Sequence, residues 1–80
     1  MKLSEINKVV EKHQTSGIKI NIFAEMMDIE ENKASFIRIE FKGGYASRIT
    51  RLKYYSNINE FEQEIIENIQ ELEKTISYDS

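Results

Sequence analysis

Apolar residues recur at helical spacing near the end of the chain, over residues 57–77. They follow one another at intervals of three or four residues, with Ile66 beside the row: Ile58, Phe61, Ile65, Ile69, Leu72 and Ile76. This spacing places them on one face of an α-helix. Asn57 or Asn59 can cap its start, with Glu60 or Glu62 as the capping-box partner three residues later. The pattern predicts an amphipathic helix whose isoleucine stripe packs on the rest of the chain.

A second helical pattern lies at the start of the chain. Leu3, Ile6, Val10 and His13 follow one another at spacings of three, four and three residues. Ser4 is a suitable N-cap residue, and Gly17 offers a stop signal after the last apolar position. We therefore predict a first helix over residues 4–14.

Two segments between these helices alternate between apolar and polar residues. In residues 18–28, one face carries Ile18, Ile20, Ile22, Ala24 and Met26. In residues 34–42, one face carries Ile37, Ile39 and Phe41. Alternation with a period of two is typical of half-buried β-strands, and the polar run at residues 30–33 is typical of a hairpin turn. The two segments are predicted to pair as antiparallel strands.

Charge indicates a register for this hairpin. Pairing Glu30 with Lys33 places Glu25 opposite Arg38 and keeps every strand isoleucine on one side. A shift by two residues would place two lysines opposite each other and would lose the Glu25–Arg38 pair. Directly opposed charges differ by up to about 1 kcal/mol per pair, so the first register is predicted.

A third strand is predicted after Gly43-Gly44, a two-residue loop typical of tight hairpins. It covers residues 45–55, and its core-facing positions would be Ala46, Arg48, Thr50, Leu52 and Tyr54. The opposite parity would bury Arg51 together with Lys53, at a high desolvation cost. A helix over the same residues is an alternative, but their β-branched and aromatic content favours a strand.

These elements predict one α+β domain over residues 1–80. The order is αβββα, with a three-stranded antiparallel meander sheet and both helices on one face. Eighty residues lie near the lower size limit for a hydrophobic core that no cross-link reinforces. The chain has no cysteine for a disulfide or a thiolate metal site. The absence of cysteine and of a long apolar run predicts a cytoplasmic protein that does not engage a membrane.

The sheet face left open by the helices is predicted to combine aromatic and basic residues. It would carry Phe23, Met27, Phe36, Tyr45, Ile49 and Tyr55, interleaved with Lys19, Arg38, Lys42, Arg51 and Lys53. Exposed apolar patches of this size mark interfaces, so the candidate contact residues are Phe23, Phe36, Arg38, Arg51, Lys53 and Tyr55. Aromatic rings beside basic residues also suit unpaired bases and their phosphates. A homodimer through this face is an alternative, and so is a helix that crosses to cover it.

The final helix carries an acidic stripe that points away from its isoleucines and from the rest of the chain. Its members are Glu60, Glu64, Glu67 and Glu71. Glu62 and Glu73 lie beside the apolar stripe, and one of them is predicted to pair with Arg48. Residues 59–80 have a charge of −6, against +4 for residues 38–58. The stripe is either a solvated face or a surface that binds a basic protein partner.

No pattern typical of catalysis or of cofactor binding is present. His13 is the only histidine, and no cysteine or carboxylate accompanies it at metal-ligand spacing. Gly43-Gly44 joins strand to strand, so it cannot act as a phosphate loop before a helix. The glutamates lie on exposed faces or in turns, where they stay ionised and cannot act as general acids. The chain is therefore predicted not to be an enzyme and to need no metal or cofactor.

The αβββα order resembles that of double-stranded-RNA-binding domains. Those domains grip phosphates with a basic cluster at the start of their second helix, where this chain has Asn59-Glu60-Phe61-Glu62-Gln63-Glu64. Carboxylates there would repel phosphate, so duplex RNA is excluded as a partner. The small size, acidic balance and isoleucine-rich composition, which is typical of AT-rich genomes, resemble phage-encoded inhibitor proteins, including anti-CRISPR proteins.

The leading hypothesis is a non-enzymatic protein-interaction module, such as an inhibitor carried by a phage or a bacterial mobile element. It would bind a protein with a basic surface through Glu60, Glu64, Glu67 and Glu71. The alternative is single-stranded nucleic-acid binding through the open sheet face.

Overall fold

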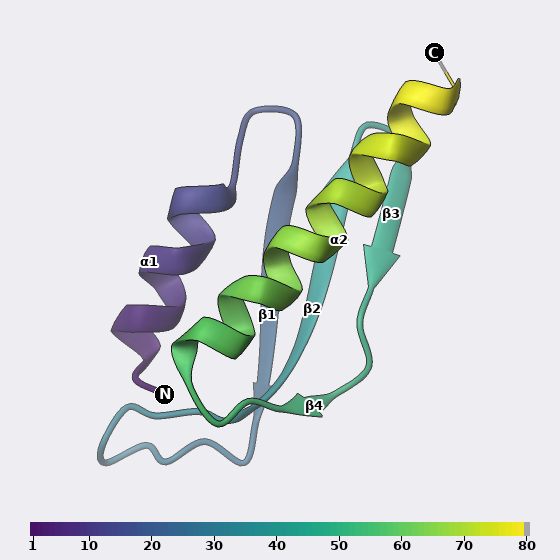
Figure 1. Cartoon of the computed structure of the whole chain (residues 1–80). Coiled ribbons are helices and arrows are strands. Elements are labelled where there is room, and N and C mark those ends of the chain that lie inside the picture. Colours follow the sequence, from purple (N-terminus) through teal and green to yellow (C-terminus); the bar gives the residue numbers. More distant parts are fainter. Residues whose placement is uncertain (80) are drawn as a thin grey trace.

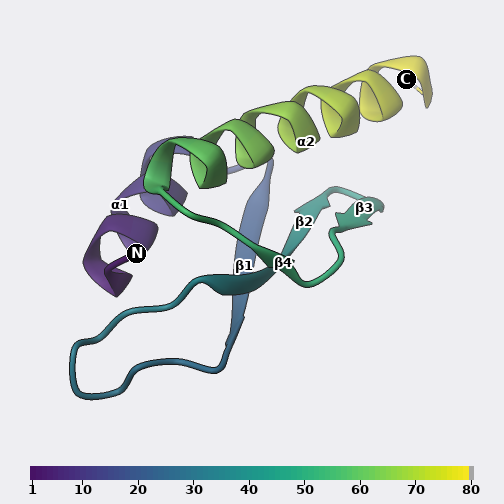
Figure 2. The ribbon, with the colours of Figure 1, turned by 60° about the horizontal axis from the view of Figure 1, so that its bottom comes forward.

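The computed structural model describes residues 1–79, and residue 80, the last of the predicted domain, lies outside them. The elements follow in the order α1 (Leu3–His13), β1 (Lys19–Glu25), β2 (Phe36–Gly43), β3 (Ala46–Ile49), β4 (Lys53–Tyr54) and α2 (Ile58–Asp79). The α+β class and the αβββα order are confirmed, with the third strand divided into β3 and β4. Both helices lie on one face of the antiparallel sheet, and α2 crosses the strands diagonally (Figure 1, Figure 2).

The core lies between the sheet and the two helices. Alternate residues of β1 and β2 face the helices, so Ile20 lies opposite Phe41 and Ile22 lies opposite Ile39. The largest fully buried side chains are Phe41, Phe61, Ile6, Ile37, Ile39, Ile65 and Leu72. Burial of each such side chain contributes about 1.5–3 kcal/mol by removing it from water. The opposite face of the sheet has no covering element within residues 1–79 (Figure 2).

The two helices begin in different ways. Asn57 caps α2, because its Oδ1 accepts the N–H of Glu60 at 3.0 Å, and Glu60 Oε2 accepts the N–H of Ser56 at 3.2 Å. This cap was predicted. The Ser4 cap predicted for α1 is wrong, since the helix begins at Leu3. The N–H of Leu3 donates instead to the carbonyl of Asn32 at 2.8 Å, so the β1–β2 connection satisfies a donor that a cap would otherwise serve.

The register of the β1–β2 hairpin differs by two residues from the predicted one. Lys19 lies opposite Lys42 and Glu25 lies opposite Phe36. The predicted Glu25–Arg38 pair is therefore wrong. Both registers keep the isoleucines on the core face, so hydrophobic burial does not distinguish them. The charged pairs lie on the exposed face, where each contributes at most about 1 kcal/mol, and the connecting loop decides the register.

This loop is wider than a two-residue turn. Asp28 and Lys33 exchange two backbone hydrogen bonds, at 2.9 and 3.1 Å, so residues 29–32 form its tip. The Asp28 Oδ1 atom accepts the N–H of Glu31 at 3.2 Å, which stabilises the turn locally. Asn32 closes the tip with a φ of 54°, a conformation that asparagine tolerates better than most residues. These bonds fix the Asp28–Lys33 pairing and exclude the predicted Glu30–Lys33 pairing.

The third strand contains a β-bulge. Both β3 and β4 pair with β2, but their registers differ by one residue. Residues 50–52 stand against residues 38 and 39 of β2, so the outer strand has one extra residue there. Thr50 holds the bulge, because its N–H donates to the carbonyl of Ile39 at 2.9 Å and its Oγ1 accepts the N–H of Ile39 at 2.9 Å.

The bulge reverses the side-chain parity of the residues that follow it. Before it, the predicted core-facing parity is confirmed as far as Thr50. After it, Lys53 and Tyr55 face the helices, whereas Tyr54 lies on the open face. The prediction that Leu52 and Tyr54 face the core is therefore wrong. The extra residue turns every later side chain to the other side of the sheet.

The turn between β2 and β3 is displaced by one residue from the prediction. Gly43 pairs with Ala46, so the two-residue loop is Gly44-Tyr45 and not Gly43-Gly44. Gly44 has a φ of +63°, and positive φ at the first position is typical of a type II′ turn. Gly43 is buried, and a Cβ there would lie 2.8 Å from Ile76 Cδ1 of α2. Gly44 is thus required for its backbone conformation, and Gly43 for its close packing contact with α2.

Alanine substitutions are expected to separate these two roles. Gly43→Ala should lower the free energy of unfolding by about 1–3 kcal/mol, because the side chains of Ile76 and Leu72 must shift to admit the methyl group. Gly44→Ala meets no atom within 4 Å and should cost about 1 kcal/mol, for its positive φ alone. Urea unfolding of both variants measures the difference. An equal or larger loss at Gly44 would contradict the packing role of Gly43.

Candidate functional site

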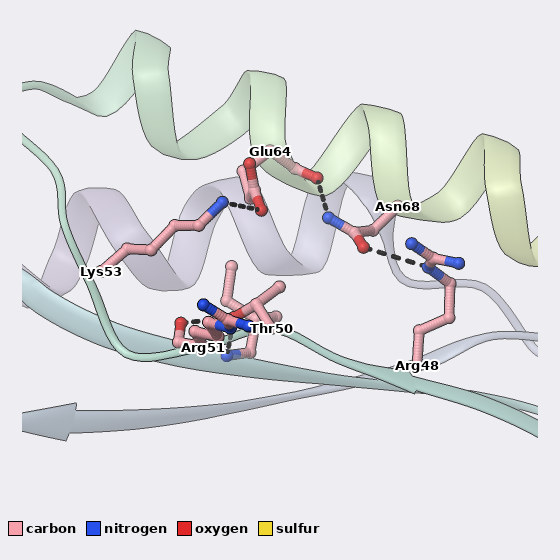
Figure 3. Close-up of polar contacts among 7 residues, drawn as sticks. Arg48, Thr50, Arg51, Lys53, Glu64 and Asn68 are labelled. Atoms are coloured by element: carbon pink, nitrogen blue, oxygen red, sulfur yellow. Dashed lines mark hydrogen bonds and ion pairs between the residues drawn. The ribbon is translucent and has the colours of Figure 1, made fainter.

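The acidic face of α2 turns partly toward the chain's own sheet. Lys53 Nζ donates to Glu64 Oε1 at 2.9 Å, which joins β4 to α2 (Figure 3). The Glu64 side chain is only 19% exposed. The prediction that Glu64 points away from the rest of the chain is therefore wrong. The bulge is the cause, because it turns Lys53 toward α2.

Arg48 faces α2, as its predicted parity requires, but its partner is not a glutamate. Its Nε donates to Asn68 Oδ1 at 3.1 Å, and Asn68 Nδ2 donates to the carbonyl of Glu64 at 2.8 Å (Figure 3). Neither Glu62 nor Glu73 pairs with Arg48 in the described part of the chain, so that prediction is wrong. Asn68 follows Glu64 by one helical turn and occupies the edge of α2 next to β3.

These contacts border a hollow of about 400 Å³ between α2 and the β3–β4 edge. Its lining is polar and charged: Arg48, Lys53, Glu64, Glu67, Asn68, Gln70 and Glu71. Two cations and three carboxylates meet there, so much of the negative charge of α2 is offset within the chain. The hollow presents a surface of mixed charge.

The other glutamates of the predicted stripe have partners within or next to α2. Glu60 serves the helix cap described above. Glu67 accepts a hydrogen bond from Gln63 at 3.3 Å, and Glu71 accepts one from Lys74 at 3.3 Å. Glu67 and Glu71 remain exposed. Of the four predicted residues, these two carboxylates lie at the rim of the hollow, and Glu60 stays exposed at the start of the helix.

Glu62 connects the two helices. Its Oε2 lies 2.7 Å from His13 Nε2 and 3.0 Å from Lys12 Nζ, both at the end of α1. The hydrogen bond with His13, followed by that with Lys12, holds the pKa of Glu62 below its ordinary value of 4.5. His13, which lies in the predicted apolar row of the first helix, thus joins α1 to α2 through this contact.

The Glu62 contact is expected to make the stability of the fold depend on acidic pH. Because the pKa of Glu62 is lowered by folding, its stabilisation is complete above pH 4.5 and is lost as pH falls below that value. Glu62→Gln should therefore unfold at a lower urea concentration than the parent at pH 7, and the difference between the two midpoints should narrow as pH falls below 4.5. Glu11→Gln, an exposed change on α1, is the matched control and should follow the parent at both pH values.

The open sheet face carries part of the predicted interface. Phe23 is 42% exposed, and the guanidinium carbon of Arg38 lies 5.0 Å from the centre of its ring. The Phe36 ring lies 5.4 Å from that of Tyr54, which is 61% exposed. Ile49 is 59% exposed on the same face, opposite Glu40. Three of the predicted contact residues, Phe23, Phe36 and Arg38, are therefore brought together.

The remaining predicted contact residues lie elsewhere. Lys53 and Tyr55 are on the helix side of the sheet, so their assignment to the open face is wrong. Arg51 is exposed within the bulge. Tyr54, which was not predicted, takes the place assigned to Tyr55. No periodic pattern could reveal this exchange, because it depends on the extra residue of the bulge.

Tyr55 is instead a core residue with an unusual hydroxyl. It is 4% exposed, and its ring meets that of Phe61 edge to face at 5.6 Å. Its hydroxyl is buried and has no hydrogen-bond partner within the described residues. Burial, assisted by the negative charge of Glu64, raises the pKa of Tyr55 to about 12. An unpartnered buried hydroxyl is destabilising, so Tyr55 is held by its ring and not by its polar end.

No protein-family model, curated protein or solved structure matches this chain. Within the described residues, no group of three or more histidine, cysteine or carboxylate side chains is arranged to hold a metal ion. No described helix is long and apolar enough to cross a membrane.

The open face has two chemically different ends. The end next to the β1–β2 loop carries Glu25, Phe36 and Tyr54, and we call it the aromatic end. Beside it, a hollow of about 230 Å³ is lined by Met26, Asp28, Lys33, Ala34, Ser35, Phe36 and Tyr54. The end next to the β2–β3 turn carries Lys19 and Lys42, and we call it the lysine end.

Proposed function

We propose that this protein is a non-enzymatic protein-interaction module that binds its partner with the open face of its sheet. The supporting observation is the exposure of Phe23, Ile49 and Tyr54 on a face that no described element covers. Large apolar side chains gathered on one surface are typical of interfaces. A module of this kind acts by covering a surface of its partner, as inhibitors and adaptors do.

The contacts of α2 favour the sheet face over the acidic helix as the principal contact. Glu64 is engaged by Lys53, and Glu60 by the helix cap. Glu67 and Glu71 keep exposed carboxylates and would add only a rim contact, which contributes more to association rate than to affinity. The sheet face offers exposed apolar side chains, and their burial in a contact would supply most of the affinity.

The charges of the open face favour a protein partner over single-stranded nucleic acid. Glu25 lies beside the aromatic rings, and Asp28 lines the neighbouring hollow together with Lys33, so carboxylates near the rings would repel phosphates. Lys53 and Tyr55, two of the residues on which nucleic-acid binding depended, lie on the other side. We expect no salt-sensitive binding of a labelled 12-nucleotide single strand; binding that is lost in Arg38→Ala would favour nucleic acid instead.

The proposed contact can be tested by affinity capture from the native host followed by mass spectrometry. We expect Phe23→Ser and Tyr54→Ser each to reduce capture of the enriched partner at least tenfold, because both remove exposed apolar area from the open face. Tyr45→Ser is the matched control, since Tyr45 is an exposed aromatic residue in the β2–β3 turn. Equal capture of the partner by all three variants, or a loss of capture in Tyr45→Ser alone, would contradict the assignment of the open face as the contact.

A further inference from the structure

The open face of β2 has a pattern of charge that is reversed about its centre. From the aromatic end, its open-face residues are Phe36, Arg38, Glu40 and Lys42. Reading from either end toward the middle, Arg38 corresponds to Glu40, and Phe36 corresponds to Lys42. The first correspondence joins opposite charges, and the second joins an aromatic ring with a cation, which attract each other when stacked.

The open face of β1 has the same kind of pattern. Its open-face residues run from Lys19 through Asn21 and Phe23 to Glu25. The first and last residues carry opposite charges, so Lys19 corresponds to Glu25 about the centre of the strand, whereas the inner pair, Asn21 and Phe23, is uncharged.

One axis serves both strands. The centre of the β1 pattern is Ile22, and the centre of the β2 pattern is Ile39. These two residues lie directly opposite each other in the sheet. Consider a two-fold axis that lies between two facing sheets and runs perpendicular to the strands, over Ile22 and Ile39. Rotation about this axis places each residue of the pattern over its counterpart in a second copy, on β1 and on β2 at once. A C2 contact requires a self-complementary surface of this kind.

The lysine end gives an independent reason to expect a partner of opposite charge. Lys19 and Lys42 lie directly opposite each other on exposed positions, an arrangement that is unfavourable within an isolated sheet. Lys42 has one ion pair, with Glu40 at 3.8 Å, and Lys19 has none in the described part of the chain. The two-fold operation would place Glu25 of a second copy next to Lys19.

We infer that the open face binds a second copy of this chain, with the two sheets packed face to face and the strands antiparallel. This inference rests on the proposed function, since a second copy would bind to the same open face. Lys19 of each copy would meet Glu25 of the other, Arg38 would meet Glu40, and Lys42 would lie over Phe36. Sheets pack in this way about 10 Å apart, with strand directions within about 30° of each other.

The face is small and half polar, so the dimer is expected to be weak. A dissociation constant in the micromolar range, on the order of 1–100 μM, suits a contact at the low end of interface sizes. Sedimentation velocity over that range of concentration should show a monomer–dimer equilibrium. Because charged pairs contribute, dimerisation should weaken in 0.5 M salt.

Charge reversal on β1 provides the decisive test. Glu25→Lys gives a chain with two lysines on β1, and Lys19→Glu gives a chain with two glutamates. Each variant alone should dimerise at least tenfold more weakly, because like charges meet twice across the axis. An equimolar mixture should regain the parent's affinity to within about threefold, since every lysine then meets a glutamate.

Glu11→Lys and Lys8→Glu are the matched controls, because they reverse exposed charges on α1, away from the sheet. They should dimerise as the parent does. Unchanged dimerisation in both β1 variants, or a mixture that stays monomeric, would overturn the inference. A parent that is monomeric at all concentrations, while partner capture still depends on Phe23, would overturn the dimer alone. Dimerisation restored in the mixture, with capture insensitive to Phe23→Ser, would instead overturn the proposed contact with another protein.

Discussion

Phe41→Ala is expected to lower the free energy of unfolding by about 3–5 kcal/mol. Phe41 is fully buried on the core face of β2, and its removal leaves a cavity between the sheet and α2 in addition to the lost transfer energy. A domain of this size has a total stability of about 4–12 kcal/mol. The variant should therefore unfold at a much lower urea concentration, or be unfolded at 37 °C.

Phe23→Ala is the matched control for this prediction. Phe23 lies on the neighbouring strand, but on the open face, where it is 42% exposed. Its loss should cost less than about 1 kcal/mol, since surface substitutions rarely cost more. Equal destabilisation by the two substitutions would show that both faces of the sheet are buried, and would contradict the one-sided core.

Tyr55 is expected to make the fold sensitive to alkaline pH. In the unfolded chain its pKa returns to the ordinary value of 10.0, so the unfolded state loses the phenolic proton first as pH rises, while the folded state keeps it to about pH 12. Ionisation of this group therefore leaves the free energy of unfolding unchanged below pH 10 and lowers it between pH 10 and 12. At about 1.4 kcal/mol per pH unit, the loss amounts to roughly 3 kcal/mol.

Tyr55→Phe should remove this loss and also stabilise the protein at neutral pH by about 1 kcal/mol, because the unpartnered hydroxyl disappears while the ring stays in place. Urea unfolding at pH 7, 9 and 11 measures both effects. Tyr54→Phe is the control, because Tyr54 is exposed and should leave the pH profile unchanged. A Tyr55→Phe variant that loses stability at pH 11 as the parent does would contradict the burial of the hydroxyl.

The sequence was sufficient to predict the elements whose burial depends on a long periodic pattern. The isoleucine stripe of α2 and the alternation of β1 and β2 each involve several large side chains, so any other arrangement would leave many of them in water. The Asn57 cap was predictable because a single side chain satisfies a specific donor. These features determined the α+β class, the order of elements and the one-sided core.

The β1–β2 register could not be predicted because the competing energies are small. The Glu25–Arg38 pair of the predicted register is replaced by Arg38 over Phe23, an exposed cation–π contact of similar strength. The loop decides between the registers, and it depends on positive φ at Met26 and Asn32. Neither methionine nor asparagine indicates a positive φ in a sequence as clearly as glycine does.

The candidate site was predicted only in part, for one reason. A single extra residue between β3 and β4 moved Lys53 and Tyr55 to the helix side and Tyr54 to the open face. The same exchange gave Glu64 a partner and weakened the expected acidic surface of α2. Phe23, Phe36 and Arg38 were placed correctly because they lie on β1 and β2, before the bulge.

The same bulge has a consequence for the behaviour of the protein at high concentration. A sheet edge with free N–H and carbonyl groups can pair with other chains and start aggregation. Here the outer edge is broken into strands of four and two residues. At the other edge, Gln14 accepts the N–H of Ile20 at 3.0 Å, and Thr15 donates to the carbonyl of Ile18 at 3.0 Å. The outer edge is thus short and interrupted, and the start of the β1 edge is occupied, so deletion of Arg51, which would straighten the outer edge, is expected to favour fibril formation.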